Sequence, residues 1–385
     1  MFFLDYLRFR WQIFKGCVMG CLFVIAAFMG LLLMISDACR SKKPDADAYY
    51  RGGLELLKED DYKHAIWKFD TAIQLYPEHA KAYMSRGLAY ARQGDANRAV
   101  QDYTKAIEID PKYALAYLNR GVAHAGSGRY DAAIADYSRS IELDPKEALA
   151  YHNRGVVQAA VGRCAEAVAD YTRALELDPK HVSTHRARAL AHSLAGAEDL
   201  AIEDCNRAVQ KDPKDSWGYY HRGFAFFRSG AYEKAEKDFH KSIEIAPDYD
   251  CAHVMVFLAR SRRGEEARGG LAAYREGRKK VKEKNWTANL VLMFLGERTP
   301  EQCLAAATSD DREEGMERRL RAHFYAGQLH VLRGNATAAR ASFQKALAAG
   351  ATWFCECPTA KAELKRLKAP GRTPTIFDLL RSGRR

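Results

Sequence analysis

Apolar and small residues recur along most of this 385-residue chain with the spacing of one helix face. An example is the set Ala99, Val100, Tyr103, Ala106 and Ile107, which has the period of an α-helix. A longer period lies over this one, because six prolines recur at intervals of 34 residues: Pro77, Pro111, Pro145, Pro179, Pro213 and Pro247. Six glycines keep the same interval: Gly94, Gly128, Gly162, Gly196, Gly230 and Gly264. The pattern predicts pairs of short helices, the first ending at glycine, where a positive φ is easy, and the second before proline.

Within each 34-residue repeat, the small and the aromatic residues hold fixed places. Counted from Ala46, Ala80, Ala114, Ala148, Val182 and Ser216, position 8 is Gly except at Ala189, and position 20 is always Ala. Position 24 is aromatic except at Cys205, and position 7 is Arg in all repeats but the first. Small residues allow two helices to approach closely, and aromatic rings fill the space between helix pairs. We expect the repeats to stack, because one pair cannot bury its apolar face alone, and we interpret the arginines as structural.

This pattern closely resembles the tetratricopeptide repeat family, and the stretch LNRGVAHAGSGRYDAAIADYSRSIELDP is close to a consensus copy. The resemblance implies an all-α fold, a right-handed α-solenoid of antiparallel helix pairs. It divides the body into six repeats: 46–79, 80–113, 114–147, 148–181, 182–215 and 216–249. Residues 250–319 are expected to hold a degenerate repeat and capping helices. A late copy follows at 320–353, and a C-terminal helix with a basic tail at 354–385.

The C-terminal third carries a second resemblance. Thr299-Pro300-Glu301-Gln302 is a well-formed helix start, with an N-cap threonine and proline in the first turn. The order of an apolar helix, a short capped helix, a repeat and a final helix over residues 285–368 is similar to the end of NlpI-type bacterial lipoproteins. Those proteins are tetratricopeptide adaptors that present substrates to a periplasmic protease. The resemblance implies an adaptor in the bacterial cell envelope, in assembly or proteolysis.

One segment near the N-terminus is long enough to cross a membrane. Residues 16–36 form an uncharged run of 21 residues after the flank 1–15, and a helix of that length spans about 30 Å of hydrocarbon. We interpret it as an uncleaved transmembrane anchor, followed by a linker at 37–45. Cleavage after Ser36-Asp37-Ala38, or lipidation of Cys39, stays open as an alternative.

The orientation of this anchor is not fixed by its flanking charges. Three basic residues stand on each side: Arg8, Arg10 and Lys15 before it, and Arg40, Lys42 and Lys43 after it. The expectation is a single-pass protein of the bacterial inner membrane with its repeats in the periplasm.

The net charge of +11 is concentrated at one end of the chain. Residues 1–250 carry 34 basic and 35 acidic side chains, whereas residues 251–385 carry 26 and 14. Such a basic end can bind anionic lipid or nucleic acid. This is our alternative function, although a solvated helix end explains the charge as well.

Candidate chemistry is sparse. The chain contains none of the nucleotide-binding, hydrolase or metalloprotease signatures, so we predict no enzyme, no cofactor and no metal. His181 and His185 have the i, i+4 spacing of zinc ligands, but no Cys or acidic ligand joins them. Cys303 with Cys355 or Cys357 is the candidate disulfide in an oxidising compartment. Cys205 is expected to be a buried free thiol.

What remains is a binding groove. In the tetratricopeptide family, first-helix positions 2, 5, 6, 9, 12 and 13 line the concave face. Carried onto this sequence, positions 5 and 6 give the following candidates for binding a peptide: Asn119, His152, Asn153, Arg186, Tyr220 and His221. An asparagine side chain can hold the backbone of an extended peptide, and Arg186 or His152 can meet a carboxylate. We therefore expect a membrane-anchored, non-enzymatic adaptor that binds a protein or peptide partner.

Overall fold

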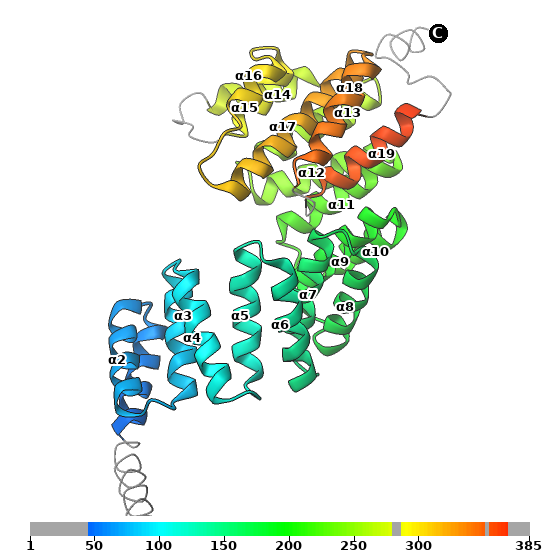
Figure 1. The fold of residues 1–385 in the computed structure, drawn as a ribbon. Coiled ribbons are helices and arrows are strands. Elements are labelled where there is room, and N and C mark those ends of the chain that lie inside the picture. The colour runs from blue at the N-terminus through cyan, green and yellow to red at the C-terminus, as the bar shows by residue number, and fades with distance from the viewer. Residues whose placement is uncertain (1–44, 279–285, 351–353, 369–385) are drawn as a thin grey trace, which may run out of the picture. The chain divides into compact units, whose positions relative to one another are not determined.

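The computed structural model describes residues 45–278, 286–350 and 354–368, which form helices joined by turns, with no strand in these ranges (Figure 1). The chain divides into two compact units, one up to Leu143 and one from Asp144 onward. Each unit is built from successive antiparallel helices that contact their neighbours in the chain. The predicted all-helical repeat architecture is confirmed.

Unit 1 begins with a helix over residues 45–58. It continues with α2 (Tyr62–Leu75), α3 (Ala80–Arg92), α4 (Ala96–Ile109), α5 (Ala114–Gly126) and α6 (Tyr130–Leu143). The repeat helices of unit 2 are α7 (Ala148–Ala160), α8 (Cys164–Leu177), α9 (Val182–Ala195), α10 (Glu198–Lys211), α11 (Ser216–Ser229) and α12 (Tyr232–Ile245). Its remaining helices are α13 (Asp250–Arg262), α14 (Arg268–Arg278), α15 (Ala288–Leu295), α16 (Pro300–Ala305), α17 (Arg312–Leu332), α18 (Ala336–Ala348) and α19 (Glu356–Lys368).

A close contact between the position-8 glycine and the position-24 ring joins the two helices of a repeat. A Cβ added to Gly121 would lie 2.7 Å from Cε1 of Tyr137, closer than side chains pack. The same contact recurs in the pairs Gly53–Phe69, Gly87–Tyr103, Gly155–Tyr171, Gly223–Phe239 and Gly327–Phe343. The rings are almost completely buried, so glycine is required for the ring to enter the helix pair.

The fifth repeat departs from this rule at both positions together. Ala189 takes the place of glycine, and Cys205 takes the place of the ring. The two side chains pack with Ala201 in one buried cluster. The Cβ of Ala189 is tolerated because the smaller Cys205 leaves room for it. Burial raises the pKa of the Cys205 thiol to about 12, which agrees with an unreactive core cysteine.

The position-7 arginines join the two helices of their repeat, and most of them also bond to the preceding helix. Arg120 donates from Nε and Nη2 to both carboxylate oxygens of Asp136, at 2.9 and 2.8 Å, and from Nη1 to Thr104 Oγ1 at 3.1 Å. Asp136 belongs to the same repeat, whereas Thr104 lies on the second helix of the preceding one. The other pairs are Arg86–Asp102, Arg154–Asp170, Arg188–Asp204 and Arg222–Asp238. The structural interpretation of these arginines is confirmed. Besides Arg120, three of them also bond to the preceding repeat: Arg86 to Asp70, Arg188 to Thr172 and Arg222 to Asn206.

The turns lie at the glycines and prolines where the sequence predicts them. Gly94 and the five glycines that repeat it all have positive φ, between 71° and 85°. Each second helix ends two residues before its proline, as α4 does at Ile109 before Pro111. The first helices α3, α5, α7, α9 and α11 begin at the residues from which the repeats were counted.

The late copy also has the repeat geometry, although its first helix is longer than expected. α17 begins at Arg312 rather than at residue 320 and runs for 21 residues. Gly334 has a φ of 75° in the turn before α18. The helix start at Thr299 is confirmed as a capping box, since Thr299 Oγ1 accepts from Gln302 N and Gln302 Oε1 accepts from Thr299 N.

The last helices of unit 2 cover the first helix of the sixth repeat (Figure 1). Phe224 of α11 packs against Phe324 of α17, and Tyr220 Oη lies 3.4 Å from Tyr325 Oη. Arg228 donates to Thr359 Oγ1 of α19 at 3.2 Å. The largest hydrophobic core of the described residues forms between these helices.

The predicted anchor at 16–36 lies outside the described residues. None of the helices within the described ranges combines the length and apolar character that crossing a bilayer requires.

The glycine contact predicts that Gly121→Leu separates α5 from the ring of Tyr137. Overpacking of this kind costs about 1–3 kcal/mol, measured as the free energy of unfolding in urea. Gly126→Leu is the matched control, because a Cβ at this last residue of α5 meets nothing within 4 Å. Equal stability of the two variants would contradict the assigned contact.

Candidate peptide-binding surface

The first helices carry exposed apolar side chains at two repeat positions. In unit 2, Leu149 and Val156 of α7 are 45% and 41% exposed, and Trp217 of α11 is 43% exposed. Of the eight large hydrophobic side chains exposed among the described residues, five stand at position 2 or 9 of a first helix: Leu115, Val122, Leu149, Val156 and Trp217. Since these are only two of 34 positions, the exposure is concentrated and marks a surface rather than scattered residues.

In unit 2 this surface runs over α7, α9 and α11, because α9 contacts both of the others. We define it as the first-helix surface of unit 2, made of Leu149, His152, Asn153, Val156, Arg186 and Trp217. Asn153 is half-buried on α7, between Leu149 and Val156 in sequence. Apolar side chains thus alternate with polar groups along the predicted groove positions.

His152 is held by a hydrogen-bonded cluster between α7 and α9. Its Nδ1 lies 2.8 Å from Thr184 Oγ1, and Nδ1 of His181 lies 2.5 Å from the same oxygen. A hydroxyl has one proton, so if Thr184 donates to one neutral imidazole, it accepts from the other. Burial, with a smaller contribution from the charge of His181, lowers the pKa of His152 to about 4. His152 is therefore a neutral group at pH 7.

Arg186 connects α9 to the start of α11. Its Nη1 donates to Asp215 Oδ1 at 2.9 Å. Burial raises the pKa of Asp215, and the guanidinium of Arg186 opposes that shift. This bond uses one of the five N–H groups of the guanidinium, so Arg186 keeps donors for a partner carboxylate.

Tyr220 and His221 differ from the expectation of an open groove. Tyr220 is 1% exposed and packs against Phe224, Phe239 and Tyr249, so it belongs to the core that α17 completes. His221 is half-buried. Burial and the charges of Arg186 and Arg228 lower its pKa to about 3. The open surface therefore ends at Trp217, because the C-terminal helices occupy the positions beyond it.

Asn119 lies in unit 1, on α5. It is half-buried, and its Nδ2 approaches Met84 Sδ at 3.8 Å. Leu115 and Val122 on the same helix are 42% and 47% exposed. Unit 1 thus repeats the arrangement of α7, an asparagine between two exposed apolar residues.

The candidate disulfide is not formed. All cysteines of the described residues are free, and Cys303 Sγ donates to the carbonyl oxygen of Asn289 at 3.1 Å. No group of three or more possible metal ligands occurs in the described ranges. His181 and His185 take different roles, the first in the Thr184 cluster and the second beside Asp204.

Much of the basic charge in the described part of the C-terminal third is paired. Arg262 meets Glu363 at 2.9 Å, Arg321 meets Glu356 at 3.3 Å, and Arg260 meets Glu236 at 2.7 Å. The tail at 369–385 lies outside the described residues. The alternative of an anionic-membrane or nucleic-acid surface stays a prediction.

The family resemblance places position 2 on the concave face, but the candidate residues come only from positions 5 and 6. Leu115, Leu149 and Trp217 are large apolar residues at the second position of a helix. This position is not one of the predicted core positions, and the three side chains are exposed. This recurrence was a usable signal for a binding surface.

Comparison with protein families identifies the repeat. Tetratricopeptide repeat models match residues 87–128, 126–162, 152–216, 216–249 and 301–352. The chain is therefore a tetratricopeptide repeat protein, of a class whose members are typically non-enzymatic protein-interaction scaffolds. A comparison with curated proteins gives no match. The similarity to NlpI-type lipoproteins stays a prediction.

One solved structure shares the fold, and two further ones are similar over part of this chain. A tetratricopeptide repeat protein from Parabacteroides merdae has 18% identity and a TM-score of 0.50, over 65% of this chain and 97% of its own. Pseudomonas aeruginosa PilF has 18% identity and a TM-score of 0.48, over 58% and 99%. YrrB, described as having an unusual peptide-binding site, has 23% identity and a TM-score of 0.43, over 48% and 95%.

The lowered pKa of His152 predicts a loss of stability in mild acid. The unfolded state gains a proton near pH 6.5, whereas the folded state resists it until about pH 4. The contribution of neutral His152 to the free energy of unfolding is therefore present above pH 6.5 and is lost as the pH falls toward 4. The loss is on the order of 1 kcal/mol between pH 7 and 5. His152→Gln should lose less stability than the parent over this range in urea unfolding. His240→Gln, at an exposed position on α12, should behave like the parent; equal pH slopes for all three proteins would refute the assignment.

Proposed function

We propose that this protein is a membrane-anchored scaffold that binds an extended segment of a protein partner along the first-helix surface of unit 2. The observation that carries the proposal is the row of exposed apolar side chains, Leu149, Val156 and Trp217, on helices that contact one another through α9. Burying them against a partner removes apolar area from water, which is favourable.

The polar groups between these side chains suit the backbone and the charges of such a segment. Asn153 offers both a donor and an acceptor to a peptide group. Arg186 supplies a positive charge whose position is fixed by Asp215. A partner segment with apolar side chains and one carboxylate, set against Arg186, fits this arrangement.

Anchoring through residues 16–36 is part of the proposal. It rests on the uncharged run of 21 residues, and it would hold the repeats beside a membrane. A role as an adaptor in the bacterial cell envelope, with the repeats in the periplasm, is the part of the proposal that rests on the similarity of residues 285–368 to NlpI-type lipoproteins. A topology reporter fused after Arg385 tests the predicted side.

The binding surface is tested by photo-crosslinking of the full chain in cells. A crosslinking amino acid at position 153 should capture a discrete partner, and adding Leu149→Asp and Trp217→Asp should reduce the captured amount by about tenfold or more, because a charge replaces two apolar contacts. Leu200→Asp is the matched control, since Leu200 is 49% exposed but lies on α10. If the Leu149→Asp/Trp217→Asp variant captures as much partner as the Leu200→Asp control, this surface is excluded.

A further inference from the structure

The fifth repeat lacks the tyrosine that the other repeats carry at position 4. Position 4 is Tyr49, Tyr83, Tyr117, Tyr151 and Tyr219 in the others, but His185 in the fifth. In four of these repeats the tyrosine ring faces the position-7 arginine, with the guanidinium carbon 5.3–5.9 Å from the ring centre: Tyr83–Arg86, Tyr117–Arg120, Tyr151–Arg154 and Tyr219–Arg222. The fold thus shows repeatedly what occupies this place.

The contacts of Tyr117 show what else surrounds this ring. Tyr117 Oη donates to the carbonyl oxygen of Pro111, in the turn that ends the preceding repeat, at 3.5 Å. Arg139, at position 26, hydrogen-bonds first to Glu142 and then to Tyr117, and both interactions raise its pKa. Tyr117 is therefore bounded by a proline turn, by Arg120 at position 7 and by Arg139 at position 26.

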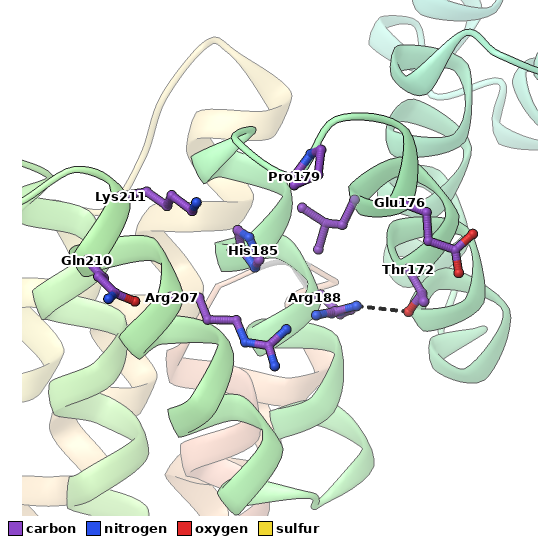
Figure 2. Close-up of a pocket in the computed structure, with 9 residues that line it drawn as sticks. Thr172, Glu176, Pro179, His185, Arg188, Arg207, Gln210 and Lys211 are labelled. Atoms are coloured by element: carbon purple, nitrogen blue, oxygen red, sulfur yellow. Dashed lines mark hydrogen bonds between the residues drawn. The ribbon is translucent and has the colours of Figure 1, made fainter.

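In the fifth repeat the equivalent residues surround a pocket of about 430 Å³. Figure 2 shows Pro179, Arg188 and Arg207 around it, with His185 between them. The imidazole of His185 is 5% exposed, and its Nδ1 lies 3.5 Å from Asp204 Oδ1. A histidine ring is smaller than a phenol, so the place that tyrosine fills elsewhere is left partly open here.

The chemistry of the pocket matches a phenol ring. Leu175 and Pro179 supply apolar contacts, and Leu175 is 7% exposed. Arg188 is held by Asp204 and Thr172, at 2.6 and 3.0 Å, so its guanidinium is fixed for a cation–π contact. Arg207 and Lys211, both on α10, bring N–H donors to a phenol oxygen.

We propose that this pocket binds the side chain of a tyrosine presented by a protein partner, in the place that the other repeats fill with their own tyrosine. Most of the lining residues belong to the second helices α8 and α10. The pocket is therefore distinct from the first-helix surface of unit 2, and either site can fail without the other. It provides an anchor on a different face of the repeat.

The test is a titration of the full chain with p-cresol, the tyrosine side chain as a free molecule. Saturable binding at one site, with a Kd on the order of millimolar for so small a ligand, should shift the ring resonances of His185 in NMR. His185→Tyr restores the ring of the other repeats, and it should weaken this binding by at least about tenfold while raising the melting temperature. Unchanged binding by that variant, or no saturable binding by the parent, overturns the proposal.

A second variant tests whether replacing the position-4 tyrosine by histidine is enough to create a binding site. Tyr117→His should open an equivalent place beside Arg120 and Arg139, and raise the number of p-cresol sites from one to two. Inorganic phosphate is the competing probe, because Arg207 and Lys211 are cationic. Perturbation of His185 by phosphate and not by p-cresol would show an anion site instead, and would also overturn the proposal.

Discussion

The arrangement of most repeats depends on one steric requirement: an aromatic ring of the second helix packs directly against a glycine of the first. The ring of Tyr137 lies where a Cβ on Gly121 would have to be. The contact sets how closely the two helices approach, because a side chain at position 121 would collide with the ring. Each of the other five repeats has both the glycine and the ring. The fifth repeat has neither, with Ala189 and Cys205 in their places.

The position-7 arginines add the connection between repeats. Where Gly121 and Tyr137 set the geometry inside a pair, Arg120 reaches Thr104 of the preceding repeat as well as its own Asp136. These ion pairs are half-buried, and burial raises the pKa of Asp102 against the opposing effect of Arg86. The cost of burying the carboxylate therefore offsets part of its attraction to the arginine. This agrees with the small net contribution of buried ion pairs to the free energy of folding.

The periodic part of the sequence predicted the fold down to the first residue of several helices, because each repeat is specified by contacts within 34 residues. The same reasoning failed where a contact spans a longer distance. Tyr220 occupies a groove position by its register, but Tyr325 and Phe324, more than 100 residues later, enclose it. The candidate disulfide of Cys303 with Cys355 or Cys357 is likewise not formed, and no period relates these residues.

Helices α17 and α19 cover α11 and so cap this end of the repeat array. Repeat proteins lengthen by duplicating a unit, and a new unit must meet the same neighbours as the old one. A copy inserted after α12 would separate Phe224 from Phe324 and Arg228 from Thr359. Lengthening at this end therefore requires a new closing structure, so duplications are expected to be accepted only within the repeats that precede the sixth.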